Sequence, residues 1–215
     1  MSNNIYKDIY SKRCQLASVA LKKNGFEVLY TDNAKEALDK VISLIPKEAK
    51  VGIGGSVTVR DIGLVEAIEK QGNTIFMDWG KPLELKEKLK KRRDALTSDV
   101  FLTSSNAITL QGQLVNIDGT GNRVAAMIFG PKKVIIIAGA NKLVDTLEEA
   151  FARIRNIAGP LNGKRLKLKT PCAITGKCNI KCDSPDRMCK VTVILEKKPS
   201  LSDITIVLVG ENLGY

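Results

Sequence analysis

The sequence predicts an α/β fold in which helices flank a mostly parallel sheet, with a cysteine-rich excursion near the C-terminal end. Amphipathic segments alternate with short runs of β-branched residues along most of the chain. Residues 134–138 are continuously apolar, which is typical of a strand buried on both faces. The connections are short, as right-handed strand–helix–strand units require. A length of 215 residues fits a single domain over residues 1–215.

The first half of the sequence predicts four helices that alternate with four strands. Asn24 and Gly25 end the first helix, Asp32 or Asn33 caps the second, and Pro46 follows its end. The expected helices cover residues 6–23, 33–45, 56–70 and 82–95, and the expected strands cover residues 26–31, 51–53, 74–77 and 100–103.

The second half predicts a hairpin and then a return to alternating helices and strands. Residues 107–110 and 114–117 flank Gln111-Gly112-Gln113, which is typical of a hairpin turn. The remaining expected elements are helices over residues 121–129 and 141–156 and strands over residues 134–138, 191–195 and 204–209. From Pro160 a basic stretch with four cysteines interrupts the alternation, and residues 160–190 are expected to be a metal-binding segment within the domain.

Composition limits the function. The chain has no histidine, which excludes Ser-His-Asp and Cys-His nucleophile systems and histidine metal sites. The 34 basic and 23 acidic residues give a net charge of +11, which either keeps the protein soluble or attracts an anionic ligand. Aromatic residues make up 5%, so nucleic acid is not an expected partner. No apolar run is long enough for a membrane helix or a signal peptide, so a cytoplasmic location is expected.

The first candidate site is the glycine loop after the strand at residues 51–53. Its backbone N–H groups and two hydroxyls could face an anion, although the loop matches neither the dinucleotide fingerprint nor the P-loop. A tight turn without a ligand is the alternative. The expected binding residues are Gly54, Gly55, Ser56 and Thr58.

The second candidate site is a pair of polar segments that follow later strands. Asp118 and Lys142 are the expected acid–base residues, and Arg123 is expected to bind a carboxylate or phosphate through two N–H groups. Ligands of open α/β sheets bind beyond the carboxyl ends of strands, although the Asp-Gly-Thr-Gly-Asn run is also good turn chemistry. The other expected binding residues are Asn106, Gly119, Thr120, Gly121, Asn122 and Asn141.

The third candidate site consists of Cys172, Cys178, Cys182 and Cys189, spaced C-x5-C-x3-C-x6-C. In a reducing compartment these cysteines are not expected to form structural disulfides. Thiolate ligands suit an iron–sulfur cluster or, as the alternative, zinc. A redox dithiol and inert thiols are the other readings. Cys14 is expected to be a buried small residue.

The simplest interpretation of the basic helix over residues 81–93 is that its charged residues form a solvent-exposed side. Docking of an acidic redox partner, or covering of an anionic ligand, is the alternative. The sequence leaves the oligomeric state open.

Together these segments resemble the LUD-domain family of lactate-utilisation proteins. The resemblance rests on residues 54–56, 103–109, 116–125 and 138–142, and the segment from Thr170 resembles compact stand-alone members with C-terminal cysteines. It implies a fold similar to sugar-phosphate isomerases and CoA transferases, a small anionic metabolite as ligand, a part in oxidising L-lactate to pyruvate, and iron–sulfur redox protein partners. No match to the catalytic glutamate of CoA transferases is present. The alternative functions are an isomerase or transferase acting on a phosphorylated sugar or CoA ester, and a non-catalytic accessory subunit.

Overall fold

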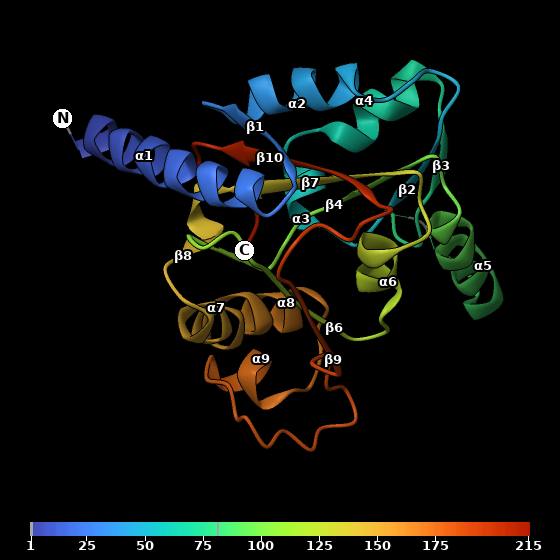
Figure 1. Ribbon diagram of the computed structural model, residues 1–215. Coiled ribbons are helices and arrows are strands. Elements are labelled where there is room, and N and C mark those ends of the chain that lie inside the picture. Colours follow the sequence, from blue (N-terminus) through green and yellow to red (C-terminus); the bar gives the residue numbers. More distant parts are fainter. Residues whose placement is uncertain (1, 81) are drawn as a thin grey trace.

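A computed structural model describes residues 2–80 and 82–215 and confirms the α/β architecture (Figure 1). Six strands form one fully parallel sheet, so the carboxyl ends of all six lie along the same edge. Their order across the sheet is β1 (Glu27–Thr31), β10 (Asp203–Val209), β7 (Lys133–Gly139), β4 (Val100–Thr103), β2 (Lys50–Ile53) and β3 (Thr74–Phe76).

The central strand β7 explains why the sheet is covered on both faces. Val134, Ile136 and Ala138 pack into the core on one face, while Ile135 and Ile137 pack into the core on the other. Successive side chains of a strand point to opposite faces, so a continuously apolar strand needs a cover on each. The prediction for residues 134–138 is therefore confirmed.

Helices provide these covers. One face of the sheet is covered by α2 (Ala34–Ser43), α3 (Val57–Asp61) and α4 (Leu64–Gln71). The other face is covered by α1 (Ser2–Lys23), α5 (Leu85–Leu96) and α6 (Asn122–Ile128). Figure 1 shows α2 and α4 on the side of the sheet away from α7 and α9. None of the helices in the described ranges is both long and apolar enough to cross a membrane.

The helix expected over residues 56–70 is instead two helices, α3 and α4. Gly63 separates them with a φ of 77°, a left-handed conformation that glycine adopts without a steric penalty. Ser56 caps α3, since its side chain accepts a hydrogen bond from the N–H of Val59.

A second, four-stranded sheet lies beside the first. The predicted hairpin is confirmed as the antiparallel pair β5 and β6, but its outer edges are extended by segments from distant parts of the chain. The order is β8 (Leu143–Val144), β5 (Ala107–Thr109), β6 (Leu114–Asp118) and β9 (Val191–Leu195). The late strand β9 thus joins this sheet, and only β10 returns to the main one.

The helix expected over residues 141–156 begins later and ends later. The chain first forms a 3-10 turn (Ala140–Lys142) and β8, and Thr146 then caps α7 (Leu147–Arg153). A π-helical turn (Ile154–Ala158) leads directly into α8 (Gly159–Arg165). Pro160 lies in the first turn of α8, where its missing N–H is tolerated, so the proline does not end the helix.

The cysteine segment follows α8 and is largely irregular. Its single short helix is α9 (Pro171–Thr175), after which the described chain runs without a helix or strand until β9. In Figure 1 this segment forms the orange loop beside α9, next to β9 and α8.

Candidate functional site

A cavity of about 310 Å³ lies beyond the carboxyl edge of the main sheet. The glycine loop after β2, the polar segment after β4 and Lys142 after β7 contribute to one wall. The turn between β6 and α6 contributes a second wall, and α8 with the end of the cysteine segment closes the opposite side. Strand-end loops of a parallel sheet therefore converge here, as expected for a ligand site of an open α/β fold.

Most of the residues proposed from the sequence lie in this cavity. Those that line it are Gly55, Ser56, Thr58, Asn106, Asp118, Gly119, Thr120, Asn122, Arg123, Lys142 and Cys189. Those that do not line it are Gly54, Gly121, Asn141, Cys172, Cys178 and Cys182.

Lys142 is the most deeply buried charged group of the cavity. The residue is 3% exposed, and its Nζ donates to Thr58 Oγ1 and Ser104 Oγ, both at 2.7 Å. Burial, together with the positive charges of Arg153 and Arg123, lowers the pKa of Lys142 to about 7, while Asp61 acts in the opposite direction. The amine therefore loses its proton more readily than an ordinary lysine.

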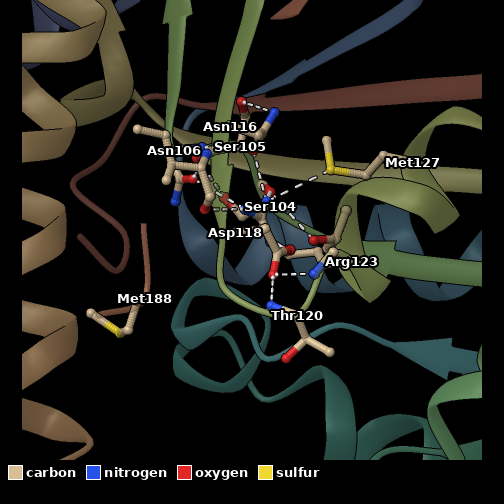
Figure 2. Close-up of polar contacts among 12 residues, drawn as sticks. Ser104, Ser105, Asn106, Asn116, Asp118, Thr120, Arg123, Met127 and Met188 are labelled. Atoms are coloured by element: carbon tan, nitrogen blue, oxygen red, sulfur yellow. Dashed lines mark hydrogen bonds and ion pairs between the residues drawn. The ribbon is translucent and has the colours of Figure 1, made fainter. Parts of the chain in front are cut away.

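Arg123 makes polar contacts with several parts of the chain, as Figure 2 shows. Its terminal nitrogens donate to the carbonyl oxygens of Ser104 and Ile117 and to the side-chain oxygens of Asn106 and Asn116, at 2.7–3.1 Å. These four bonds use all four terminal N–H groups. Arg123 therefore joins strand-end loops, and binding of a carboxylate or phosphate through two of its N–H groups stays a prediction.

Asp118 holds the turn that faces the cavity. Its Oδ1 accepts from the N–H groups of Thr120 and Gly121 at 3.1 Å, and its Oδ2 lies 3.4 Å from Arg123 Nε. Both side chains of this ion pair are nearly buried, at 10% and 13% exposed. The turn chemistry expected for Asp118 is thus present, and the carboxylate is also the counter-charge of Arg123.

Asn141 and Gly54 support the site without lining it. The Asn141 side chain accepts a hydrogen bond from the N–H of Leu213 at 3.1 Å and donates one to the Gly214 carbonyl at 3.3 Å. These two bonds hold the segment that follows β10. This brings Tyr215 to the cavity wall. Gly54 allows close packing, since a Cβ there would lie 3.1 Å from Arg123 Cγ.

Several lining residues were not proposed from the sequence. Ser104 belongs to the polar segment at residues 103–109, but the sequence does not show its contact with Lys142, because that contact depends on the pairing of β4 with β7. Asn162 and Arg165 lie one helical turn apart on α8, and the continuation of the helix past Pro160 is the signal that could have found them. No pattern pointed to three others, Asp78, Met188 and Tyr215.

Met188 and Cys189 bring the cysteine segment to the cavity. The Met188 sulfur accepts from Asn162 Nδ2 at 3.3 Å, and a Cβ at Gly119 would lie 3.2 Å from the Met188 carbonyl. In Figure 2 Met188 lies between the C-terminal helices and the Asp118 and Arg123 cluster. The end of the cysteine segment therefore contributes to the cavity wall.

All four C-terminal cysteines are free thiols and half-buried. Burial raises the pKa of Cys178 and Cys189, and neighbouring cysteines add to the rise. Arg187 donates to the carbonyls of Cys182 and Cys189, which ties two turns of the segment together. Within residues 2–80 and 82–215 no three cysteine, aspartate or glutamate side chains are grouped as metal ligands, so the metal site stays a prediction.

The comparisons with known proteins agree with the resemblance seen in the sequence. A DUF162-family protein of Deinococcus radiodurans, known from a crystal structure, shares the fold with a TM-score of 0.55 and 12% sequence identity. The similarity covers 93% of this chain and 98% of that protein. No curated protein matches the sequence. The LUD domain model matches residues 14–209. This chain therefore belongs to the LUD-domain family.

Proposed function

We propose that this LUD-domain protein binds a small anionic metabolite of the lactate and pyruvate type in the strand-end cavity, as a component of the oxidation of L-lactate to pyruvate. The observation that carries the proposal is the environment of Lys142. This buried amine contacts two hydroxyls, and no carboxylate among the described residues forms an ion pair with it. A buried cation is stable when an anion compensates it, which a bound carboxylate would do.

The size and surroundings of the cavity support a small anion. A cavity of about 310 Å³ is at the lower end of the range for ligand pockets. Ser56 and Thr58 bring hydroxyls to the cavity wall, and Arg165 adds a positive charge to it. A protein with a net charge of +11 also attracts anions over a long range.

Calorimetric titration of the full chain with L-lactate, D-lactate, pyruvate and inorganic phosphate tests the proposal. L-Lactate or pyruvate should bind, and Lys142→Met should weaken binding at least ~10-fold, since a charge-assisted contact is lost. Lys40→Met is the matched control, because Lys40 is exposed on α2 and does not line the cavity. Equal binding by the Lys142 and Lys40 variants, or no binding of any carboxylate, would overturn the proposal.

An isomerase or transferase acting on a phosphorylated sugar or CoA ester is the second candidate. It is favoured by the hydroxyls of the glycine loop, which line the same cavity as Lys142. Thermal-shift measurements with phosphosugars and CoA esters separate the two functions, since a true ligand stabilises the protein in proportion to its concentration over its Kd. Stabilisation by phosphate esters alone would favour this second function.

We further propose that the cysteine segment binds an iron–sulfur cluster, with zinc as the alternative. The support is the donor set, four free thiols within residues 172–189, and the nearby positive charges of Arg155 and Arg187, which stabilise thiolates. The thiols would have to move together to share one ion. Iron, sulfide and zinc analysis of anaerobically purified protein tests this, with Cys178→Ser as the variant that should lose the metal and Cys14→Ala as the control. Protein free of iron, sulfide and zinc would overturn it.

The iron–sulfur protein partner expected from the family would meet the basic helix α5. Lys86, Lys90 and Arg93 of this helix are exposed, and Arg92 reaches from it to Asp78 and Thr120 at the cavity wall. An acidic redox protein is the partner that this charge favours. Co-purification that is lost at high salt and in Lys86→Glu would support docking there.

A further inference from the structure

Lys142 has the surroundings of a nucleophilic amine. Lys142 is one of the residues that line the cavity, although only 3% of the residue is exposed. The charged groups that act on it are the guanidinium groups of Arg153 and Arg123 and, with the opposite effect, the carboxylate of Asp61. Burial and neighbouring cations are the two conditions that hold lysine in its neutral, nucleophilic form near pH 7.

Two hydroxyls lie where an addition to a carbonyl needs them. Thr58 Oγ1 and Ser104 Oγ are each 2.7 Å from Lys142 Nζ. Hydroxyls at this distance can accept a proton from the nitrogen and pass a proton to an oxygen bound to the same carbon. Thr58 is fixed in α3 and Ser104 follows β4, so both groups are held by the fold rather than by a mobile loop.

We propose that Lys142 forms an imine with the carbonyl carbon of a small 2-oxo acid bound in the cavity. The imine proposal rests on the proposed function, which supplies the class of ligand, a small carboxylate. It adds that a ligand with a ketone carbonyl beside its carboxylate becomes covalently attached to the protein. The positive charge of Arg165, which lines the cavity, favours the carboxylate. L-Lactate has a hydroxyl where a 2-oxo acid has its ketone carbonyl, so it binds without reacting.

The reaction balances without an oxidant. The nitrogen lone pair of Lys142 attacks the carbonyl carbon and a C–N bond forms, while one N–H proton passes through Thr58 or Ser104 to the carbonyl oxygen to give a neutral carbinolamine. The second N–H proton passes in the same way to the carbinolamine hydroxyl, the C–O bond breaks, and water departs as the C=N bond forms. The products are the imine and one water molecule, and hydrolysis reverses the reaction.

Borohydride trapping of the full chain tests the imine. Protein is incubated with pyruvate, reduced, and examined by intact mass and by peptide mapping. One reduced pyruvyl adduct per chain is expected, on Lys142, and its rate of formation should rise as the pH passes about 7. Lys142→Gln should give no adduct, Ser104→Ala should slow trapping by ~10²-fold, and Lys40→Met should be trapped like the wild type.

Competition separates this inference from the proposed function. An excess of L-lactate should suppress trapping, because it occupies the cavity without reacting. Pyruvate that binds in calorimetry but is never trapped would overturn the imine and leave the anion-binding proposal intact. Equal trapping on surface lysines in the wild type and in Lys142→Gln would also overturn the imine, whether or not the Lys142 variant folds fully.

Discussion

Gly139 lies directly against the backbone of Glu211. A Cβ at position 139 would be 2.6 Å from the Glu211 carbonyl oxygen and 2.6 Å from the Leu213 nitrogen. The same carbonyl accepts a hydrogen bond from the N–H of Ala140 at 2.9 Å. The end of β7 and the segment that carries Tyr215 therefore pack backbone to backbone, with no room for a side chain between them.

Gly139→Ala should destabilise the protein by about 1–3 kcal/mol, because backbone atoms would have to move to admit the methyl group. Urea unfolding measures the change. Gly55→Ala is the matched control, since a Cβ there meets nothing within 4 Å. The displaced segment carries Tyr215 to the cavity, so ligand affinity should fall as well. A Gly139→Ala variant as stable as Gly55→Ala would show that the backbone of Glu211 and Leu213 leaves room for a methyl group at position 139.

Arg123→Met should lower the free energy of unfolding by about 3–5 kcal/mol. The change leaves Asp118 as a buried carboxylate without its counter-charge and removes one donor from each of four acceptors. Arg123→Lys should rescue little, because one ammonium cannot reach acceptors spread around a planar guanidinium. Chemical denaturation measures both variants.

Arg165→Met provides the control for Arg123. Arg165 is exposed and bonds to Asn162 on its own helix, so its loss should cost less than ~0.5 kcal/mol. Arg123→Lys within ~1 kcal/mol of the wild type would contradict the assignment of Arg123 as the residue that joins the loops.

The parts of the fold that depend on local pattern were predictable. The apolar run at residues 134–138 predicts a strand covered on both faces because each of its side chains needs a core. Polar and glycine residues directly after strands predict a site at the carboxyl edge, and the main sheet is fully parallel. Ser56, Asn122 and Lys142 consequently meet at one cavity.

The parts that depend on distant contacts were not predictable. Arg123 looks like a ligand-binding arginine in sequence, and only folding brings Asn106 and Asn116 to its guanidinium. Asn141 has the sequence context of a binding residue, but its partners are Leu213 and Gly214, more than 70 residues later. Short-range periodicity contains no information about such pairs. The sequence therefore does not distinguish polar residues that line the cavity from polar residues that hold its loops in place.

The thiols should divide into two classes. Burial raises the pKa of Cys14 to about 12, whereas the four C-terminal cysteines are partly accessible. In metal-free, reduced protein, a thiol reagent such as DTNB should modify four thiols in the native state and the fifth only after unfolding, because thiolate and access are both required. Cys14→Ala should leave the native count at four and lower the unfolded count from five to four. Five reactive thiols in the native wild type would contradict the burial of Cys14.

Lys142 should make stability depend on pH in a defined window. Its pKa is about 7 in the folded chain against an ordinary value of 10.5, so between these values the unfolded chain binds a proton that the folded chain does not. The free energy of unfolding of the wild type should therefore rise with pH across this window, relative to Lys142→Met, by on the order of a few kcal/mol. Below about pH 7 both states of the wild type carry the proton and the difference between the proteins is constant; above 10.5 neither does.

Urea unfolding from about pH 6 to about pH 10 measures this difference. The slope is the informative quantity, because Lys142→Met also removes two hydrogen bonds to hydroxyls, and that loss does not depend on pH. Lys40→Met should run parallel to the wild type, since Lys40 is exposed. Parallel curves for the wild type and Lys142→Met would mean that the buried amine keeps an ordinary proton affinity, and the neutral nucleophile required for the imine would then be scarce at pH 7.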